Sequence, residues 1–280
     1  VSSNPDIGGS RAAMAMMAAE TLGLPIERVR AIVADTTSIG FSATTGGSRV
    51  TFATGMAVVQ AAEKVVADLK RRAGLIWECP IEQVQWRDGV ASCLDAGKEV
   101  KPLTLAEIAG RTGRTGGPLS AEVSLNAQGA GPGFAVHLCD IELDPDTGRA
   151  TVVRYTAAQD VGRAIHPSYV EGQIQGGVAQ GVGWALNEAY VYNAAGVLEN
   201  PSFLDYRVPV ASDLPMIETI LVESAPNKRH PFGAKGVGEA PIVPPLAAVA
   251  SALSHVIGQR LTELPLSPPR LLEAIDARSA

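Results

Sequence analysis

The residue best suited to acid–base chemistry is a carboxylate in a segment with almost no side-chain bulk. Glu239 lies between Gly238 and Ala240, within the run Gly233-Ala-Lys-Gly-Val-Gly-Glu-Ala-Pro241. Small neighbours let a carboxylate approach a bound group closely, and partial burial would make it a stronger base. The alternative is a structural role, in which Glu239 complements the dipole at the start of a helix. On position alone, the helix-start interpretation is favoured.

Three glycine-dense loops, each just before or inside an expected helix, are candidates for binding an anion. They are Asp6-Ile-Gly-Gly-Ser-Arg11, Thr45-Gly-Gly-Ser-Arg49 and Gly172-Gln-Ile-Gln-Gly-Gly-Val-Ala-Gln-Gly-Val-Gly183. Glycine lets the backbone approach a ligand, a helix N-terminus offers free N–H groups, and the two arginines suit phosphate. Ordinary capping and tight packing are favoured for any one such loop, but three in one acidic chain weaken that explanation. None matches the P-loop pattern.

The third loop also carries Gln173, Gln175 and Gln180 on an otherwise apolar helix. A buried glutamine needs partners for its carbonyl and its amide, and a polar ligand with matching edges is one solution. Equally, Gln173 and Gln180 could face water, because seven residues of helix place them on nearly the same side.

The first half of the chain predicts two long helices with small elements around them. We expect a helix over 11–20 capped by Ser10 and ended by Gly23, a strand over 29–34, a loop to residue 48, a helix over 52–72, a hairpin over 84–93 that turns at Asp88-Gly89, and a short helix over 104–108. The glycine-rich stretch 110–133 predicts a connector between two lobes.

The second half predicts a hairpin followed by helices and further strands. The hairpin pairs 134–143 with 150–155; helices are expected over 168–187, 247–257 and 269–275, and strands over 189–192 and 217–222. The fold class is therefore α+β with mixed sheets and packed helices, in a first lobe over 1–125 and a second over 126–280.

Composition excludes several classes of protein. Among 280 residues, 46% are hydrophobic and 19% charged, so the chain is not disordered throughout, and a net charge of −6 argues against nucleic-acid binding. We expect no membrane span and a cytoplasmic location, since no run approaches the required length and the first residues do not resemble a signal peptide. A start at Val1 without Met suggests a fragment, a processed subunit or a trimmed chain.

The three cysteines, Cys79, Cys93 and Cys139, are too few and too scattered for a disulfide framework, an iron–sulfur cluster or a zinc ribbon. Buried or unreactive thiols in a reducing compartment are expected, and no metal ligand is assigned.

The ordered set of motifs resembles the molybdenum hydroxylases, the xanthine dehydrogenase and aldehyde oxidase family. The resemblance rests on the runs Thr45-Gly-Gly-Ser-Arg49, Asp160-Val-Gly-Arg-Ala-Ile-His-Pro167, Glu171–Gly183, Asp205-Tyr-Arg-Val-Pro209 and Gly233–Glu239, and it covers nearly the whole chain. It implies the second, C-terminal molybdopterin-binding domain of a large subunit. The cofactor would be molybdopterin, usually as the cytosine dinucleotide, whose own sulfurs bind the metal.

The resemblance also implies roles for particular residues. Glu239 would be the catalytic base that takes a proton from a water-derived oxygen as it attacks an electron-poor carbon. Gln173 would contact the pterin, and Gly46, Gly47 and Ser48 would approach the metal. With these we group the remaining expected cofactor-binding residues Gly8, Gly9, Ser10, Arg11, Arg49 and Gln180. The family's first loop has a polar residue between its glycines, whereas Gly8 and Gly9 are adjacent, so Ser10 or Arg11 would replace that contact.

The family's first molybdopterin-binding domain is absent from this chain, so partners are expected. They are a chain or domain carrying that half, an iron–sulfur subunit and an FAD subunit. The expected reaction is oxidation of a small organic substrate, an N-heterocycle or an aldehyde, with water as the oxygen source.

Two other functions remain open. A non-catalytic scaffold or assembly subunit would retain the fold without stoichiometric metal, and the adjacent Gly8 and Gly9 motivate it. A plain nucleotide- or phosphate-binding protein would use the same glycine loops without a pterin.

Overall fold

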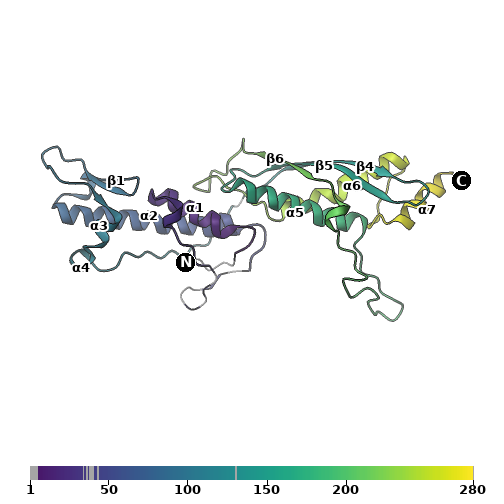
Figure 1. Cartoon of the computed structure of the whole chain (residues 1–280), viewed down its shortest axis with the longest axis horizontal. Helices are drawn as coiled ribbons and strands as arrows, with labels where there is room; N and C mark the ends of the chain where they lie inside the picture. The colour runs from purple at the N-terminus through teal and green to yellow at the C-terminus, as the bar shows by residue number, and fades with distance from the viewer. Residues whose placement is uncertain are drawn as a thin grey trace. The chain divides into compact units, whose positions relative to one another are not determined.

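The computed structural model describes residues 6–33, 35, 37, 41–42, 44–129 and 131–279. The chain forms two compact units (Figure 1). The first comprises residues 1–130 and 228–234, and the second comprises 131–227 and 235–280. The expected division after residue 125 lies close to this boundary, but no sequence signal indicates that 228–234 return to the first unit.

The first unit is built on two helices, α1 (Ser10–Leu22) and α2 (Val50–Trp77). The helix over 11–20 is confirmed and ends at Gly23 in the left-handed conformation (φ 65°), as expected. Its N-cap is Gly9, not Ser10, because Ser10 is already helical and buried. The helix over 52–72 is also confirmed and is longer than expected. A short 3-10 turn, η1 (Ile26–Arg28), follows α1.

A small sheet covers the C-terminal half of α2. It contains β1 (Val84–Arg87), β2 (Val90–Cys93) and β3 (Leu103–Thr104), all antiparallel, preceded by η2 (Ile81–Gln83). The hairpin turns at Asp88-Gly89, as expected, and both residues have positive φ (50° and 73°), which matches the twist of the strands. The core between this sheet, α2 and the short helix that follows contains Leu69, Ala73, Trp77, Val84, Ala91, Leu103 and Ile108.

The short helix expected over 104–108 is α3 (Leu105–Ala109), with Thr104 and Glu107 forming a capping box. A further turn of helix, α4 (Thr112–Thr115), lies in the expected connector.

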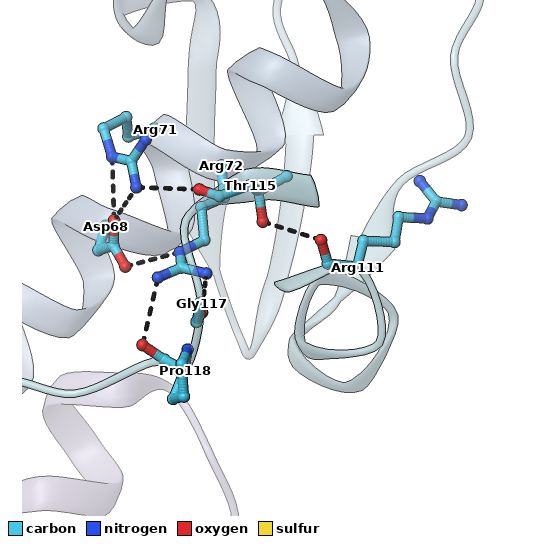
Figure 2. Close-up of polar contacts among 7 residues, drawn as sticks. All are labelled: Asp68, Arg71, Arg72, Arg111, Thr115, Gly117 and Pro118. Carbon is cyan, nitrogen blue, oxygen red and sulfur yellow. Dashed lines mark hydrogen bonds and ion pairs between the residues drawn. The ribbon is translucent and has the colours of Figure 1, made fainter. Parts of the chain in front are cut away.

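A buried arginine fastens this connector to α2 (Figure 2). Arg72 is 3% exposed, and its guanidinium donates to Asp68 and to the carbonyls of Gly117 and Pro118. Arg71, which is 48% exposed, binds the same carboxylate and the carbonyl of Thr115. Burial raises the pKa of Asp68, but the hydrogen bonds from both arginines outweigh it and lower that pKa overall. A guanidinium can satisfy several acceptors at once, so one side chain fixes the path of a glycine-rich segment.

The second unit is a three-stranded sheet with helices on one face. Strands β4 (Ala135–Leu143) and β5 (Ala150–Asp160) form the expected antiparallel hairpin, and β6 (Ile217–Val222) pairs with β5 in parallel. A parallel neighbour requires a crossover, which α5 (Pro167–Leu186) provides. Side chains of the sheet, α5 and α6 (Val243–Ile257) form much of the core, and Tyr155, Ile174, Val178, Val249 and Leu253 are among its most buried members.

The remaining elements close the second unit. They are η3 (Ala211–Asp213), η4 (Ala240–Ile242) and α7 (Pro268–Ser279). The α+β class is confirmed, as are the expected helices at residues 168–187, 247–257 and 269–275. Two expected strands are wrong: residues 29–33 form no strand, and residue 34 is outside the described part of the chain. Residues 189–192 contribute only the single bridge between Tyr192 and Leu198, since their polar contacts are local.

Two helical segments of the described chain, Val50–Trp77 and Ala240–Ile257, are long and apolar enough to cross a membrane by length and composition. The expectation that no run approaches this length is therefore wrong. Core helices of soluble proteins meet the same criterion, so the absence of a membrane span stays a prediction.

Candidate functional site

Glu239 stands at the start of η4, where the chain enters α6. Its backbone carbonyl accepts a hydrogen bond from the N–H of Ile242 (3.3 Å), so it occupies the helix-start position expected for a structural carboxylate. Its side chain is exposed in this chain, which corrects the expectation of partial burial. Part of the reason is local: Gly238 and Ala240 carry so little bulk that neither neighbour covers the carboxylate.

The segment before Glu239 is anchored by a buried ion pair. Nζ of Lys235 lies 2.6 Å from Oδ2 of Asp160, with the two side chains 10% and 11% exposed. The other carboxylate oxygen of Asp160 accepts the N–H of Gly162 (3.0 Å), and the N–H of Lys235 donates to the carbonyl of Val161 (3.1 Å). Both the main chain and the side chain of Lys235 therefore hold this segment to the end of β5, four residues ahead of Glu239.

The segment after Glu239 is fixed by contact with α5. A methyl group added at Gly177 would lie 2.7 Å from Cβ of Pro241, and one added at Gly181 would lie 2.7 Å from Cβ of Pro245. Any larger residue would push η4 and α6 away from α5. These two glycines are thus explained by packing within the chain, and they set the position of Glu239 relative to α5.

Two other glycines of α5 have no such explanation. No atom of the described residues lies within 4 Å of a Cβ built at Gly172 or Gly176, and both residues are exposed. Glycine inside a helix costs about 0.5–1 kcal/mol relative to alanine, so an exposed pair without packing contacts points to something that approaches the helix from outside. The chain presents an open strip of backbone on this face.

The three glutamines divide between the faces of α5. Gln175 is half-buried and donates to the carbonyl of Ile217 (3.3 Å), so the sheet satisfies it. Gln180 is exposed and Gln173 is half-buried. Gln173 lies about one turn before both Gly176 and Gly177, so it stands at the border between the open face of α5 and the face against which η4 packs. The structure therefore brings Gln173 and the start of η4 to the same part of the second unit.

In the first unit, the loop over Gly8–Arg11 is held together by Asp6. Gly8 and Gly9 both have positive φ (56° and 81°). The carboxylate of Asp6 accepts from the N–H of Arg11 (3.0 Å) and from the hydroxyl of Ser10 (3.4 Å), and it pairs with the Arg11 guanidinium (3.3 Å). Ser10 is buried, whereas Arg11 is exposed and could reach a ligand as well.

The loop over Thr45–Arg49 is open at its glycines. Gly46, Gly47 and Arg49 are exposed, and a Cβ built at Gly46 or Gly47 meets no atom of the described part of the chain within 4 Å. Ser48 is held at a positive φ of 55°, an uncommon conformation for a residue with a side chain. Oγ1 of Thr45 is buried and has no hydrogen-bond partner within the described residues.

The two loops of the first unit lie at the same end of it. Met17 of α1 contacts Gly55 near the start of α2, and Trp86 Nε1 donates to the carbonyl of Leu22 at the end of α1 (2.9 Å). Since Trp86 belongs to the sheet that covers the far half of α2, the two helices run in the same direction. Their N-terminal loops are therefore neighbours.

Three residues to which the sequence assigns no role contribute to these arrangements. Asp160 and Lys235 lie within two of the motifs that carry the family resemblance, but their pairing joins positions far apart in the sequence. His230 is 4% exposed, and its ring packs at a tilt of 36° against Phe52 in the first turn of α2 (centroids 5.6 Å apart), which fastens residues 228–234 to the first unit. Burial lowers the pKa of His230. A buried polar pair or histidine leaves no periodic signal, so the sequence alone could not have found them.

Within the described residues, no group of three or more His, Cys, Asp or Glu could hold a metal ion. The candidate site residues instead offer open glycine backbone, helix N-termini, amide side chains and the exposed carboxylate of Glu239. Together with the α+β fold, they define a domain that binds a large polar cofactor along its backbone.

Comparison with known proteins identifies that domain. The profile of the molybdopterin cofactor-binding domain matches residues 2–215. The putative xanthine dehydrogenase molybdenum-binding subunit of Escherichia coli K12 is 32% identical over 272 residues, which cover 95% of this chain and 36% of the relative. The carbon monoxide dehydrogenase large chain of Hydrogenophaga pseudoflava is 32% identical over 258 residues, covering 89% and 32%.

Solved structures agree. The Cu,Mo-CO dehydrogenase superimposes with a TM-score of 0.88 at 25% identity, covering 99% of this chain and 36% of that one. Quinoline 2-oxidoreductase from Pseudomonas putida 86 superimposes with a TM-score of 0.82 at 27% identity, over 96% and 35% of the two chains. This chain belongs to the molybdopterin cofactor-binding domain family of the molybdenum hydroxylases. It spans about a third of the length of these relatives.

The observed residues fit such a cofactor. In the first unit, open backbone at Gly46 and Gly47 lets a polar group approach without steric conflict, and in the second unit Gly172 and Gly176 do the same. The hydroxyl of Thr45, which has no partner among the described residues, and, in the other unit, the amide of Gln173 are each able to exchange hydrogen bonds with a polar group.

Proposed function

We propose that this chain forms part of a molybdenum-dependent oxidoreductase and that Glu239 is its general base. The observation that carries the proposal is the open strip of α5. Gly172 and Gly176 have no packing role, whereas Gly177 and Gly181 fix the neighbouring η4, the element that Glu239 begins. Glycine occurs on two sides of α5. The proposal explains both: the side with Gly177 and Gly181 packs against η4, and the side with Gly172 and Gly176 contacts the cofactor.

The proposed roles of the residues follow from their surroundings. Gln173 and Gln180 bind the pterin along α5 through their amides. Gly46, Gly47, Ser48 and Arg49 approach the cofactor at the start of α2, and Gly8, Gly9, Ser10 and Arg11 do so at the start of α1. Arg11 and Arg49 are exposed and suit a phosphate group, which is consistent with the cytosine dinucleotide form.

The bound cofactor would supply two-electron oxidation of a carbon centre. The contribution of the chain is to place a carboxylate that accepts the proton of water-derived oxygen. Exposure of Glu239 is consistent with a base whose final environment is completed by substrate and by a second protein surface. The Lys235–Asp160 pair and the Gly177–Pro241 contact keep its backbone in place, which is the preorganisation that such a base requires.

Partners belong to the proposal. The chain corresponds to about a third of each relative, so a chain or domain carrying the first molybdopterin-binding half is needed, together with iron–sulfur and FAD subunits as electron carriers. A surface arm over 187–216 supports a large interface. It is stabilised by Asn200, which accepts from the N–H of Val191 (2.9 Å) and donates to the carbonyl of Ala189 (2.7 Å). It nevertheless exposes Phe203 (92%), Leu204 (96%) and Met216 (87%).

The proposed substrate is a small organic molecule, an N-heterocycle or an aldehyde, and water is the proposed source of oxygen. The proposed location of the protein is the cytoplasm. Relatives include the nicotine 6-hydroxylase large subunit of Paenarthrobacter nicotinovorans and an aldehyde oxidoreductase molybdenum-binding subunit of Escherichia coli K12. These names motivate the substrates to be screened first.

The test is to capture the native complex through a tag on this chain and to measure molybdenum, pterin and turnover. About one molybdenum per chain, with large partner chains, is expected. Glu239→Gln should keep the cofactor and lower turnover by about 100-fold or more, because a base in proton transfer contributes on that order. Glu263→Gln is the matched control, since Glu263 is 85% exposed and lies far along the chain from the candidate residues.

Turnover in Glu239→Gln equal to that of the control would contradict the role of this residue. A complex with intact partners and no molybdenum would instead support a scaffold. One observation favours that second function: Asp6 already engages Ser10 and Arg11, which leaves fewer groups for a ligand.

A further inference from the structure

Two of the three cysteines meet in the first unit. Cys79 directly follows the C-cap of α2, and Cys93 ends β2. Their sulfur atoms are 3.9 Å apart, and both residues are half-buried, so each remains accessible to a small reagent. The two cysteines are 14 positions apart in the sequence, which gives no sign that they meet. Their closeness contrasts with the expectation of scattered, unreactive thiols.

The backbones that carry the two sulfurs are both held in place. The N–H of Cys79 donates to the carbonyl of Gly74 (2.9 Å), after Glu78 has turned the chain in the left-handed conformation (φ 54°). Cys93 is paired with Val84 in the β1–β2 ladder. A disulfide sulfur–sulfur bond is about 2 Å long, so rotation of the side chains and a small backbone adjustment would close the gap.

We propose that Cys79 and Cys93 are a modification site, at which a low-molecular-weight disulfide such as oxidised glutathione converts the two thiols to an intramolecular disulfide. One thiolate attacks a sulfur of the oxidant and releases one reduced thiol, leaving a mixed disulfide. The second thiolate then attacks the protein sulfur of that mixed disulfide and releases another reduced thiol. Two cysteine thiols are oxidised, one external disulfide is reduced, and the two protons pass to the two released thiols.

The surroundings set the conditions for this exchange. Burial raises the pKa of the Cys79 thiol, and the neighbouring Cys93 adds to the rise, whereas the nearby Lys98 ammonium opposes it. Nζ of Lys98 is fixed beside Cys79 by hydrogen bonds to the carbonyls of Trp77 (2.9 Å) and Glu78 (2.6 Å). Mildly alkaline buffer therefore suits the experiment, because only the thiolate attacks.

The site is independent of the proposed cofactor function. The cofactor loop precedes the first residue of α2, whereas the cysteines lie at its other end, and a 28-residue helix is about 42 Å long. Formation of the disulfide can therefore be tested without measuring turnover.

The test uses the complete chain in its native complex, treated with oxidised glutathione, blocked with an alkylating reagent while denatured, and digested with trypsin. Cleavage after Arg72, Arg87 and Lys98 separates the two cysteines onto different peptides. A linked pair of these peptides, two hydrogens lighter than their sum, is expected, and it should disappear after reduction. Cys139 is the internal control: it lies on β4, where burial raises its pKa to about 11, and it should be alkylated.

Two variants make the result decisive. Cys93→Ser removes the second thiol, so Cys79 should retain glutathione as a stable mixed disulfide. Cys139→Ala should leave the linked peptides unchanged. Complete alkylation of Cys79 and Cys93 in the treated native complex, or linkage of either one to Cys139 instead, would overturn the proposal.

Discussion

The ammonium group of Lys235 lies 2.6 Å from the Asp160 carboxylate, and both side chains are about nine-tenths buried. Removing one partner leaves an uncompensated buried charge, which typically costs about 3–5 kcal/mol. We therefore expect Lys235→Met to lower the free energy of unfolding by about 3 kcal/mol. Adding Asp160→Asn should restore part of the loss, because the remaining charge is removed and an oxygen for the Gly162 N–H is kept.

Urea unfolding of the four proteins in this double-mutant cycle measures the coupling. Arg154→Met is the control, since the Arg154–Glu218 pair is 67% and 53% exposed and should change stability by about 1 kcal/mol or less. Equal effects of the buried and exposed substitutions would show that Lys235 does not anchor the segment before Glu239.

Neighbouring glycines of α5 should respond in opposite directions. Gly176→Ala should raise the free energy of unfolding by about 0.5–1 kcal/mol, because its Cβ meets nothing within 4 Å. Gly177→Ala should lower it by about 1–3 kcal/mol, because its Cβ would overlap Pro241. Chemical denaturation checks both.

Cofactor content separates stability from binding at the same two positions. If the open face of α5 receives the pterin, Gly176→Leu should fold and yet contain less molybdenum per chain than the unmodified protein. Full cofactor occupancy in Gly176→Leu would argue against this face as the binding surface.

Acid should weaken the second unit through His137. Burial lowers the pKa of His137 to about 4 from an ordinary value of 6.5, while its Nδ1 lies 3.0 Å from the Tyr155 hydroxyl. The imidazole of His137 therefore binds a proton below pH 6.5 in the unfolded chain, but only at about pH 4 in the folded chain. The stabilisation is complete above pH 6.5 and is lost as the pH falls to 4.

Unfolding measured across this pH range tests the assignment. His137→Gln should make stability depend less steeply on pH than in the unmodified protein. His230 contributes in the same direction within the first unit, since burial also lowers its pKa. An unaltered slope in His137→Gln would exclude this histidine as the cause.

The first unit should depend strongly on one arginine and weakly on its neighbour. Arg72→Met leaves Asp68 with Arg71 alone and removes the donor of the Gly117 and Pro118 carbonyls, at an expected cost of about 2–3 kcal/mol (Figure 2). Arg71→Met removes a half-exposed partner of the same carboxylate and should cost about 1 kcal/mol or less. Thermal unfolding of the two variants distinguishes them, and similar melting temperatures would contradict the fastening role of Arg72.

Most of the fold could be predicted from local sequence patterns. Helical periodicity and end signals located α1, α2, α5, α6 and α7, and the Asp88-Gly89 turn located the β1–β2 hairpin. The strand expected at residues 189–192 failed because alternation of apolar and polar residues does not reveal whether a neighbouring strand exists. Asn200 satisfies part of that backbone locally and leaves an arm in place of a sheet.

The sequence by itself determined the chemistry available: a carboxylate in a glycine-rich run, three glycine loops, amide side chains and the elements that carry them. Only the tertiary structure decided which glycines of α5 support η4 and which are open, that Lys235 meets Asp160, and that Cys79 faces Cys93. Secondary structure follows from residues a few positions apart, which any single stretch of sequence contains. Burial and pairing depend on which distant surfaces pack together, and that information belongs to the whole chain.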